Sequence, residues 1–172
     1  MAAIAEIGWG TSSARRRSIS HDDRALVEDA RTMGEAALWL LAIAVGRDAC
    51  EGGLVHCIVP GEPRLVTRAA HAPDTRRALG ASVSMHDASF VGALRDGAND
   101  ALTDWARSMT TLRLVAAGLS AVGVLAIPLR SRGRDAGLLE VSAPQRRLAF
   151  TPTNVAILRD LADAFDARPS QV

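Results

Sequence analysis

The stretch AVGVLAIPLRSRGRDAGLLEVS, residues 121–142, decides the fold of this 172-residue chain. It contains two apolar runs, Val122–Leu129 and Ala136–Val141, on either side of the polar linker Arg130–Asp135. Short runs rich in Val, Ile and Leu around a Gly-containing linker predict an antiparallel hairpin, with Gly133 as the turn residue of positive φ. The first run barely alternates with polar residues, which predicts a strand that is covered on both faces and central in its sheet.

Composition narrows the class of protein. A hydrophobic content of 48% over 172 residues predicts one domain with a substantial core. The net charge of +1 gives no bulk attraction to nucleic acid or to a membrane surface. All 20 basic residues are arginine, which excludes Schiff-base chemistry and the lysine of a phosphate-binding P-loop. The uncharged stretch Leu114–Leu129 is shorter than the ~20 residues of a membrane-spanning helix and contains Gly118, Gly123 and Pro128.

The two cysteines and the chain start bear on the compartment. Cys50 and Cys57 are too few for a disulfide framework, although a bridge between them stays open. The first residues lack the apolar run and cleavage site of a signal peptide. We therefore expect a cytoplasmic protein with reduced cysteines.

The chain divides into a domain and two short ends. We expect residues 1–19 to form a flexible tail, residues 20–168 to form the domain, and residues 169–172 to form a C-terminal tail. Ser20 is placed to cap a helix that continues to Gly46, because apolar residues recur at steps of three and four from Leu26 to Ala44. Its end, Ala36–Val45, is apolar all round, so it must bury a second face against the C-terminal helix or a second copy of the chain.

The remaining patterns predict a mixed domain. After the first helix they indicate a turn at Gly52-Gly53, a strand at Leu54–Val59, a turn at Pro60–Pro63, and strands at Leu65–His71 and Ala81–Met85. The middle of the chain follows with a short helix at Phe90–Arg95, a short strand at Ala101–Trp105 and a helix at Met109–Ala117. The final helix comes after the hairpin and is capped by Thr151, with Pro152 at its first position. The order predicts an α+β domain with an antiparallel sheet and helices at both ends.

Three stretches resemble the GAF domain family. The first is Ala126–Leu129 with Arg132–Arg134 and Gly137–Leu139, which resembles the family's "PL…G…G-L" hairpin. The second is Phe150-Thr151 before a helix with Leu158 and Leu161-Ala162, which resembles its "F-T…L…L-A" ending. The third is Phe90–Gly92 with Gly97 and Thr103-Asp104, which resembles its "G-x-V-G…G…D" segment, with Ser89-Phe90 in place of the usual leading Gly. The resemblance covers about residues 20–167. It implies an antiparallel sheet of about six strands flanked by N- and C-terminal helices, often dimerising through those helices.

The family's fold does not fix function, so the function depends on which of the family's binding sites this chain carries. The resemblance implies an Asn/Lys/Phe/Asp/Glu signature for cyclic-nucleotide binders, but this chain has no lysine, and Asn154 and Val155 stand where Asp and Glu belong. Bilin attachment needs a cysteine in the middle segment, whereas His56-Cys57 lies in the first strand. There alternation predicts a buried cysteine and an edge or surface histidine.

The other chemistries of the family are also poorly matched. His71 and His86 are the remaining candidates for an axial haem ligand, and we expect both to be structural or exposed. Cys50 and Cys57 have no second pair at zinc-ligand spacing. They also precede the pocket segment in which a free methionine sulfoxide reductase would need an attacking and a resolving thiol.

The segment after the mid-domain Asp remains the best candidate site. In GAF domains it often walls the small-molecule pocket, and here it offers an aromatic face and two guanidinium groups. The predicted ligand-binding residues are Phe90, Asp104, Trp105, Arg107, Met109 and Arg113, with a capped core and solvated arginines as the structural alternative.

We therefore expect a non-enzymatic GAF-type sensory or regulatory domain that binds a small molecule and signals through its terminal helices. The alternative is a ligand-free dimerisation or protein-interaction module, and a free methionine sulfoxide reductase is a distant third. A homodimer is expected through residues 24–46 and 153–167. No nucleic acid, membrane or metal partner is expected, and the sequence names no cofactor.

Overall fold

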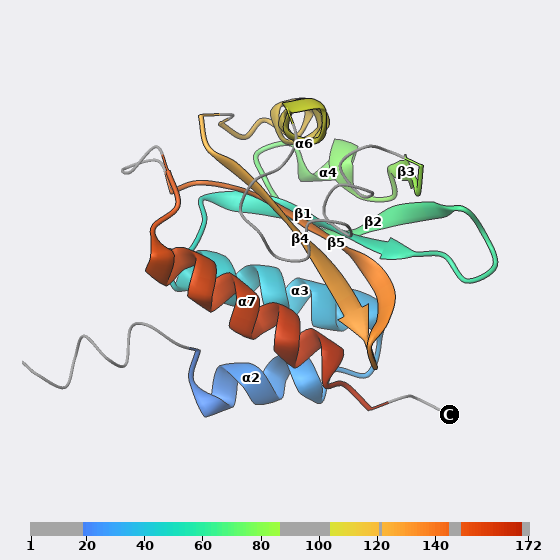
Figure 1. Cartoon of the computed structure of the whole chain (residues 1–172), viewed down its shortest axis with the longest axis vertical. Coiled ribbons are helices and arrows are strands. Elements are labelled where there is room, and N and C mark those ends of the chain that lie inside the picture. Colours follow the sequence, from blue (N-terminus) through green and yellow to red (C-terminus); the bar gives the residue numbers. More distant parts are fainter. Residues whose placement is uncertain (1–18, 87–103, 121, 145–148, 170–172) are drawn as a thin grey trace, which may run out of the picture.

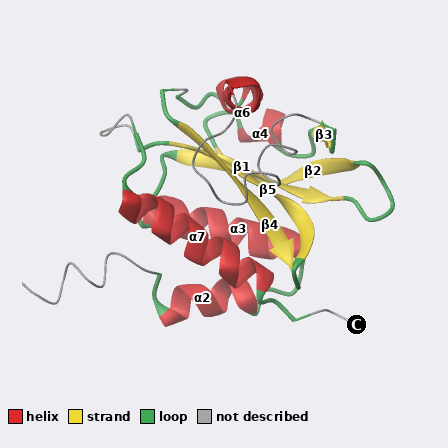
Figure 2. Ribbon diagram, viewed as in Figure 1, coloured by secondary structure: helices red, strands yellow, loops and turns green. Residues whose placement is uncertain are grey.

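A computed structural model of the chain describes residues 19–86, 104–120, 122–144 and 149–169. One antiparallel sheet lies between two unequal layers (Figures 1 and 2). Helices α2, α3 and α7 cover one face, while α6 and α4 lie on the other. The elements are α2 (His21–Glu28), α3 (Met33–Gly46), β1 (Gly52–Ile58), β2 (Arg64–His71), α4 (Thr75–Ala78), β3 (Ser82–Ser84), α6 (Asp104–Ala116), β4 (Val124–Ser131), β5 (Arg134–Ser142) and α7 (Pro152–Asp166).

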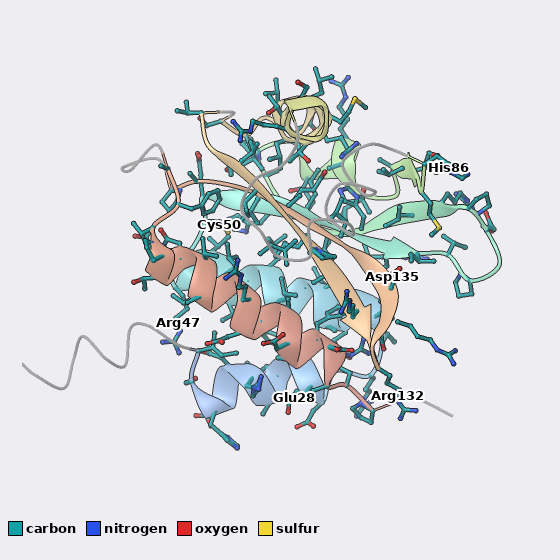
Figure 3. All side chains as sticks on the ribbon, in the orientation of Figure 1. Glu28, Arg47, Cys50, His86, Arg132 and Asp135 are labelled. Atoms are coloured by element: carbon teal, nitrogen blue, oxygen red, sulfur yellow. The ribbon has the colours of Figure 1, made fainter. Side chains whose placement is uncertain are left out.

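The expected hairpin is formed by β4 and β5. Its turn is tight, because Ser131 pairs with Arg134 and leaves only Arg132 and Gly133 between the strands. Both turn residues have positive φ, 55° and 72°, which is the two-residue turn that matches the twist of a hairpin. The turn is tied to the end of α7, where Asp166 accepts hydrogen bonds from the backbone N–H groups of Arg132 and Gly133 (Figure 3).

The position of this hairpin in the sheet differs from the prediction. The order is β3-β2-β1-β5-β4, so β4 lies at the edge of the five described strands and β5 and β1 are interior. Among the described strands β4 is therefore not central, because burial on both faces does not require a partner on both edges. Leu125 and Ile127 pack toward the helices, while Ala126 packs on the other face. The described sheet has five strands, one fewer than expected.

The N-terminal helix is two helices. The Ser20 cap is confirmed as a capping box with Asp23, but α2 ends at Glu28 and α3 begins after a second cap, Thr32. The Thr32 hydroxyl accepts from the N–H of Glu35, whose carboxylate accepts from the N–H of Arg31. A local cap therefore overrides the continuous apolar periodicity. The predicted end of α3 at Gly46 is confirmed.

The main core lies between the sheet and the α2, α3 and α7 layer. It joins Leu40 and Leu41 of α3 to Leu158, Leu161 and Phe165 of α7 and to the facing residues of β1, β4 and β5. The C-terminal helix thus covers the second apolar face of α3. Thr151 caps α7 as predicted, with Pro152 in its first turn.

Two other local predictions are wrong. Gly52 and Gly53 begin β1 and form no turn. A Cβ on Gly52 would lie 2.3 Å from the carbonyl oxygen of His71, and a Cβ on Gly53 would lie 2.4 Å from that of Glu140, so these glycines permit close strand contact. Of the strand expected at Ala101–Trp105, residues 101–103 lie outside the described residues, and Asp104 and Trp105 belong to the start of α6.

The helix expected at Phe90–Arg95 lies outside the described residues. The strands expected at Leu54–Val59, Leu65–His71 and Ala81–Met85 correspond to β1, β2 and β3 within two residues at each end. The helix expected at Met109–Ala117 corresponds to α6, which begins earlier, at Asp104. No helix among the described residues has the length and apolar character needed to cross a membrane.

Candidate functional site

A carboxylate is fully buried in the middle of the sheet, on the face that carries α6. Glu140 of β5 has no exposed side-chain surface. Arg113 donates to it from Nε at 2.8 Å and from Nη2 to its other oxygen, in a bidentate pair. Thr110 Oγ1 donates to Oε1 at 2.8 Å, and His56 Nε2 donates to Oε2 at 2.9 Å. The carboxylate therefore joins α6 to strands β1 and β5.

The network continues into β2. His56 Nδ1 lies 3.0 Å from Thr67 Oγ1, and the Thr67 hydroxyl donates to the carbonyl oxygen of Ala81 at 3.3 Å. His56 and Thr67 are 1% and 2% exposed, so both are removed from bulk water. Glu140, His56, Thr67, Thr110 and Arg113 form what we call the Glu140 network.

The pKa of Glu140 reflects two opposing effects. Burial raises it, but hydrogen bonds and charge from Arg113 and His56 outweigh burial and hold the pKa at about 2. Glu140 is therefore an anion at physiological pH. It compensates the charge of Arg113, whose side chain is 16% exposed.

Strand pairing explains how these side chains meet. His56 lies opposite Leu138 and diagonal to Glu140 on the same face of the sheet. The β1–β2 register shifts between Val55 and His56, and this irregularity places His56 directly opposite Thr67. Gly137 allows β5 to approach closely, since a Cβ there would lie 2.1 Å from the carbonyl oxygen of His56.

Helix α6 supplies the other half of the network. Thr110 and Arg113 are three residues apart, a spacing that puts both side chains on one helix face. The same helix is held by buried Leu114, which packs in a small cluster with Leu54 and Ala117. Apolar packing thus fixes the helix, and the polar network fixes its rotation and register over the sheet.

A pocket of about 230 Å³ lies beside the network, between the sheet and helices α4 and α6. His56 and Thr67 contribute buried polar atoms, and Arg77 and Arg113 contribute guanidinium groups. The other lining residues are apolar or small, namely Leu54, Ala78, Ala81, Ser82, Val83, Ala116 and Ala117. A mostly apolar cavity with a few convergent polar groups is typical of small-molecule sites.

The six predicted site residues do not all line this pocket in the described structure. Arg113 lines the pocket and belongs to the Glu140 network. Met109 lies on α6 but is not among the lining residues, and Arg107 is exposed and lines a separate depression with Phe150. Phe90 lies outside the described residues, and Asp104 and Trp105 are described only as backbone of α6. Among the predicted site residues whose side chains are described, Arg113 is the one that lines the pocket.

Sequence reasoning missed the strand residues of the site. The expectation that His56 is an edge or surface histidine is wrong, because β1 is an interior strand and both of its faces are covered. Glu140 lies within the apolar run Ala136–Val141, and an acidic residue inside Gly-Leu-Leu-Glu-Val is itself the signal of a buried, paired charge.

The described histidines other than His56, and both cysteines, do not line this pocket. His71 and His86 are exposed; His71 lines a different depression, and His86 lies beyond the end of β3 (Figure 3). Cys50 and Cys57 are free and buried. Burial, with Asp48 and Glu51 nearby, raises the pKa of Cys50 to about 12, and burial raises that of Cys57 to about 11.

The cysteines therefore lack the exposed thiolate that sulfoxide reduction needs, and that alternative has no support. Among the described residues, no three His, Cys, Asp or Glu side chains come together at a site that could hold a metal ion.

Comparisons with known proteins address the fold. No family model and no curated protein matches the sequence. Among solved structures, the chain is similar to the GAF domain from Acinetobacter phosphoenolpyruvate-protein phosphotransferase, with 11% identity, a TM-score of 0.57, and coverage of 90% of this chain and 93% of that one. At this identity the likeness concerns the fold, and it agrees with the hairpin and ending motifs. The chain has a GAF-like α+β fold.

Proposed function

We propose that this chain is a non-enzymatic sensory or regulatory domain that binds a small molecule in the pocket beneath α6. The observation that carries the proposal is the Glu140 network at the pocket wall, because it ties a pocket-lining helix to the interior strands of the sheet. Buried charges are costly unless they are paired, so their presence here favours a positioning role over a purely structural one.

The sheet offers a direct route from the pocket to the terminal helices. Side chains alternate along a strand, so Glu140 meets α6 while its neighbours Leu139 and Val141 pack in the core with α3 and α7. A ligand that binds one arrangement of α6 more tightly than another would shift β5 and, through it, the helical layer. Arg113 is retained as a binding residue, and His56 and Thr67 are added to it.

The proposal is tested with a substitution that fills the pocket without disturbing the core. Ala116 is exposed on α6 and lines the pocket, so Ala116→Trp should block it. Val115→Trp is the matched control, because Val115 is 50% exposed on the same helix and does not line the pocket. Native mass spectrometry of the purified chain should detect a bound small molecule in the wild type and the control and lose it in Ala116→Trp.

Signalling has its own measurement. On addition of the identified molecule, backbone amide chemical shifts should change in α3 and α7 as well as in α6. A molecule retained equally by Ala116→Trp would contradict binding in this pocket. Binding that changes shifts only around α6 would contradict signalling through the terminal helices.

A second candidate, a homodimerisation module, is favoured by one observation. Leu26, Leu38 and Trp39 of the helical layer are 41%, 56% and 40% exposed. They lie within the expected interface 24–46, whereas the exposed residues of 153–167 are Arg159, Asp163 and Ala167. The interface proposed is therefore α2 with α3. Light scattering should give a dimer that Trp39→Ser dissociates; a monomeric wild type would end this alternative.

A further inference from the structure

The charge of the pocket points to its ligand class. We infer that the pocket takes a small monocarboxylate, with its carboxylate beside Arg77 and a compact apolar body against the inner wall. This inference rests on the ligand-binding function proposed above. It concerns the chemical class of the molecule, which the fold does not determine.

The described lining is cationic at one position that no described carboxylate compensates. It contains the guanidinium groups of Arg77 and Arg113, and no carboxylate is among its described residues. Glu140, which lies behind the lining, already pairs with Arg113. Arg77 is exposed on α4, and within the described ranges no carboxylate lies within ion-pair distance of it. A guanidinium at the open side of a pocket is suited to a planar carboxylate, which it can bind through two parallel hydrogen bonds.

The inner wall fixes the size and character of the rest of the ligand. Leu54, Val83, Ala78 and Ala117 give apolar surface, and each of these side chains is at most 8% exposed. The volume of about 230 Å³ is below the range of drug-sized sites but exceeds the ~150 Å³ of an apolar cavity that accepts benzene. A single ring or a short branched chain with one carboxylate therefore fits this volume.

The polar part of the pocket wall limits the net charge that the ligand can carry. His56 and Thr67 are almost fully buried, and both are within the network that holds the anionic Glu140. A second negative charge on the ligand would approach this carboxylate in a medium of low dielectric constant and would be repelled. The ligand is accordingly a monoanion whose charge stays at the Arg77 side.

The test compares matched acids and amides on the full chain. Benzoate and 3-methylbutanoate are titrated by isothermal calorimetry against benzamide and 3-methylbutanamide, which have nearly the same shape without the charge. We expect the acids to bind about tenfold more tightly or better, since hydrogen bonds to charged groups exceed those to neutral groups. Arg77→Gln should abolish the difference, and Arg76→Gln, the exposed neighbour on α4 that does not line the pocket, should preserve it.

Each outcome decides the inference. Equal binding of acids and amides, loss of the preference in Arg76→Gln as well, or no binding by any of the four probes would overturn it. The proposed function is judged separately by the molecule that the purified chain retains, with Ala116→Trp and Val115→Trp as the pair. A retained molecule without carboxylate preference would leave the sensory function standing and remove this ligand class.

Discussion

Glu140→Gln is the substitution that tests the network most directly. The carboxylate accepts four hydrogen bonds, two from Arg113 and one each from Thr110 and His56. A glutamine amide keeps one oxygen but turns an NH₂ group toward these donors, and it leaves the Arg113 charge without its counter-ion. Breaking a buried ion pair by removing one partner costs about 3–5 kcal/mol. For a chain of this length, that corresponds to a fall in Tm of about 6–20 °C.

A double-mutant cycle separates the pair from its surroundings. Glu140→Gln, Arg113→Met and the double variant are unfolded in urea at pH 7, and their free energies of unfolding are compared. We expect the double variant to lose less unfolding free energy than the two single variants lose together, by at least about 1 kcal/mol. The reason is that the double variant leaves neither Glu140 nor Arg113 behind as an unpaired charge. Glu62→Gln is the control, since the Glu62–Arg64 pair is exposed and its loss should leave Tm unchanged.

The result that would refute the reasoning is equally specific. If Glu140→Gln lowers Tm no more than Glu62→Gln does, the buried carboxylate is not held as an anion by its donors. If the cycle is additive within about 0.5 kcal/mol, Glu140 and Arg113 do not act as a pair. Either outcome would remove the physical basis for treating α6 as coupled to β5.

Three further predictions concern the pH dependence of stability, the buried thiols and the close contact of β1 with β5. Because the pKa of Glu140 is held at about 2 against an ordinary 4.5, its stabilisation is complete above pH 4.5 and is lost as the pH falls toward 2; acid titration of unfolding should show a loss of about 3 kcal/mol that Glu140→Gln lacks. The thiols of Cys50 and Cys57 should resist a thiol-specific disulfide reagent at pH 8 in the folded chain and react in urea, and rapid native labelling would contradict their burial. Gly137→Ala should destabilise the fold, as measured by a lower urea midpoint, since the added Cβ meets the carbonyl oxygen of His56 at 2.1 Å; an unchanged midpoint would show that β1 and β5 can separate at no cost.

The elements that sequence predicted well are those governed by local chemistry. The caps at Ser20 and Thr151 and the turn at Gly133 depend on side chains within three residues of the backbone they stabilise. Thr32 follows the same rule, but the apolar periodicity around it masked the break between α2 and α3. The edge position of β4 depends on pairing partners far away in the chain, which periodicity does not report.

The site was harder to predict because it is assembled across strands. Arg113 was found because it lies in the segment where the GAF resemblance placed a pocket wall. His56, Thr67 and Glu140 come from three strands separated by up to 84 residues, and each alone looks like an ordinary strand residue. The sheet register, including the irregularity at Val55/His56, makes them neighbours.

The two sides of the sheet differ in how their apolar side chains are joined. On the helical side a single continuous cluster links α2, α3 and α7 to the strands. On the α6 side the buried residues that the structure describes form two small clusters, one around Leu65 and Leu138 and one around Leu54 and Leu114. Because cooperative units of a protein open in order of their local stability, we expect the α6 side to open before the helical core.

We expect such sub-global opening to widen the pocket while the helical core stays folded. The pocket contents would then exchange with solvent at less than the total free energy of unfolding, and the folded scaffold would be the template on which α6 closes again.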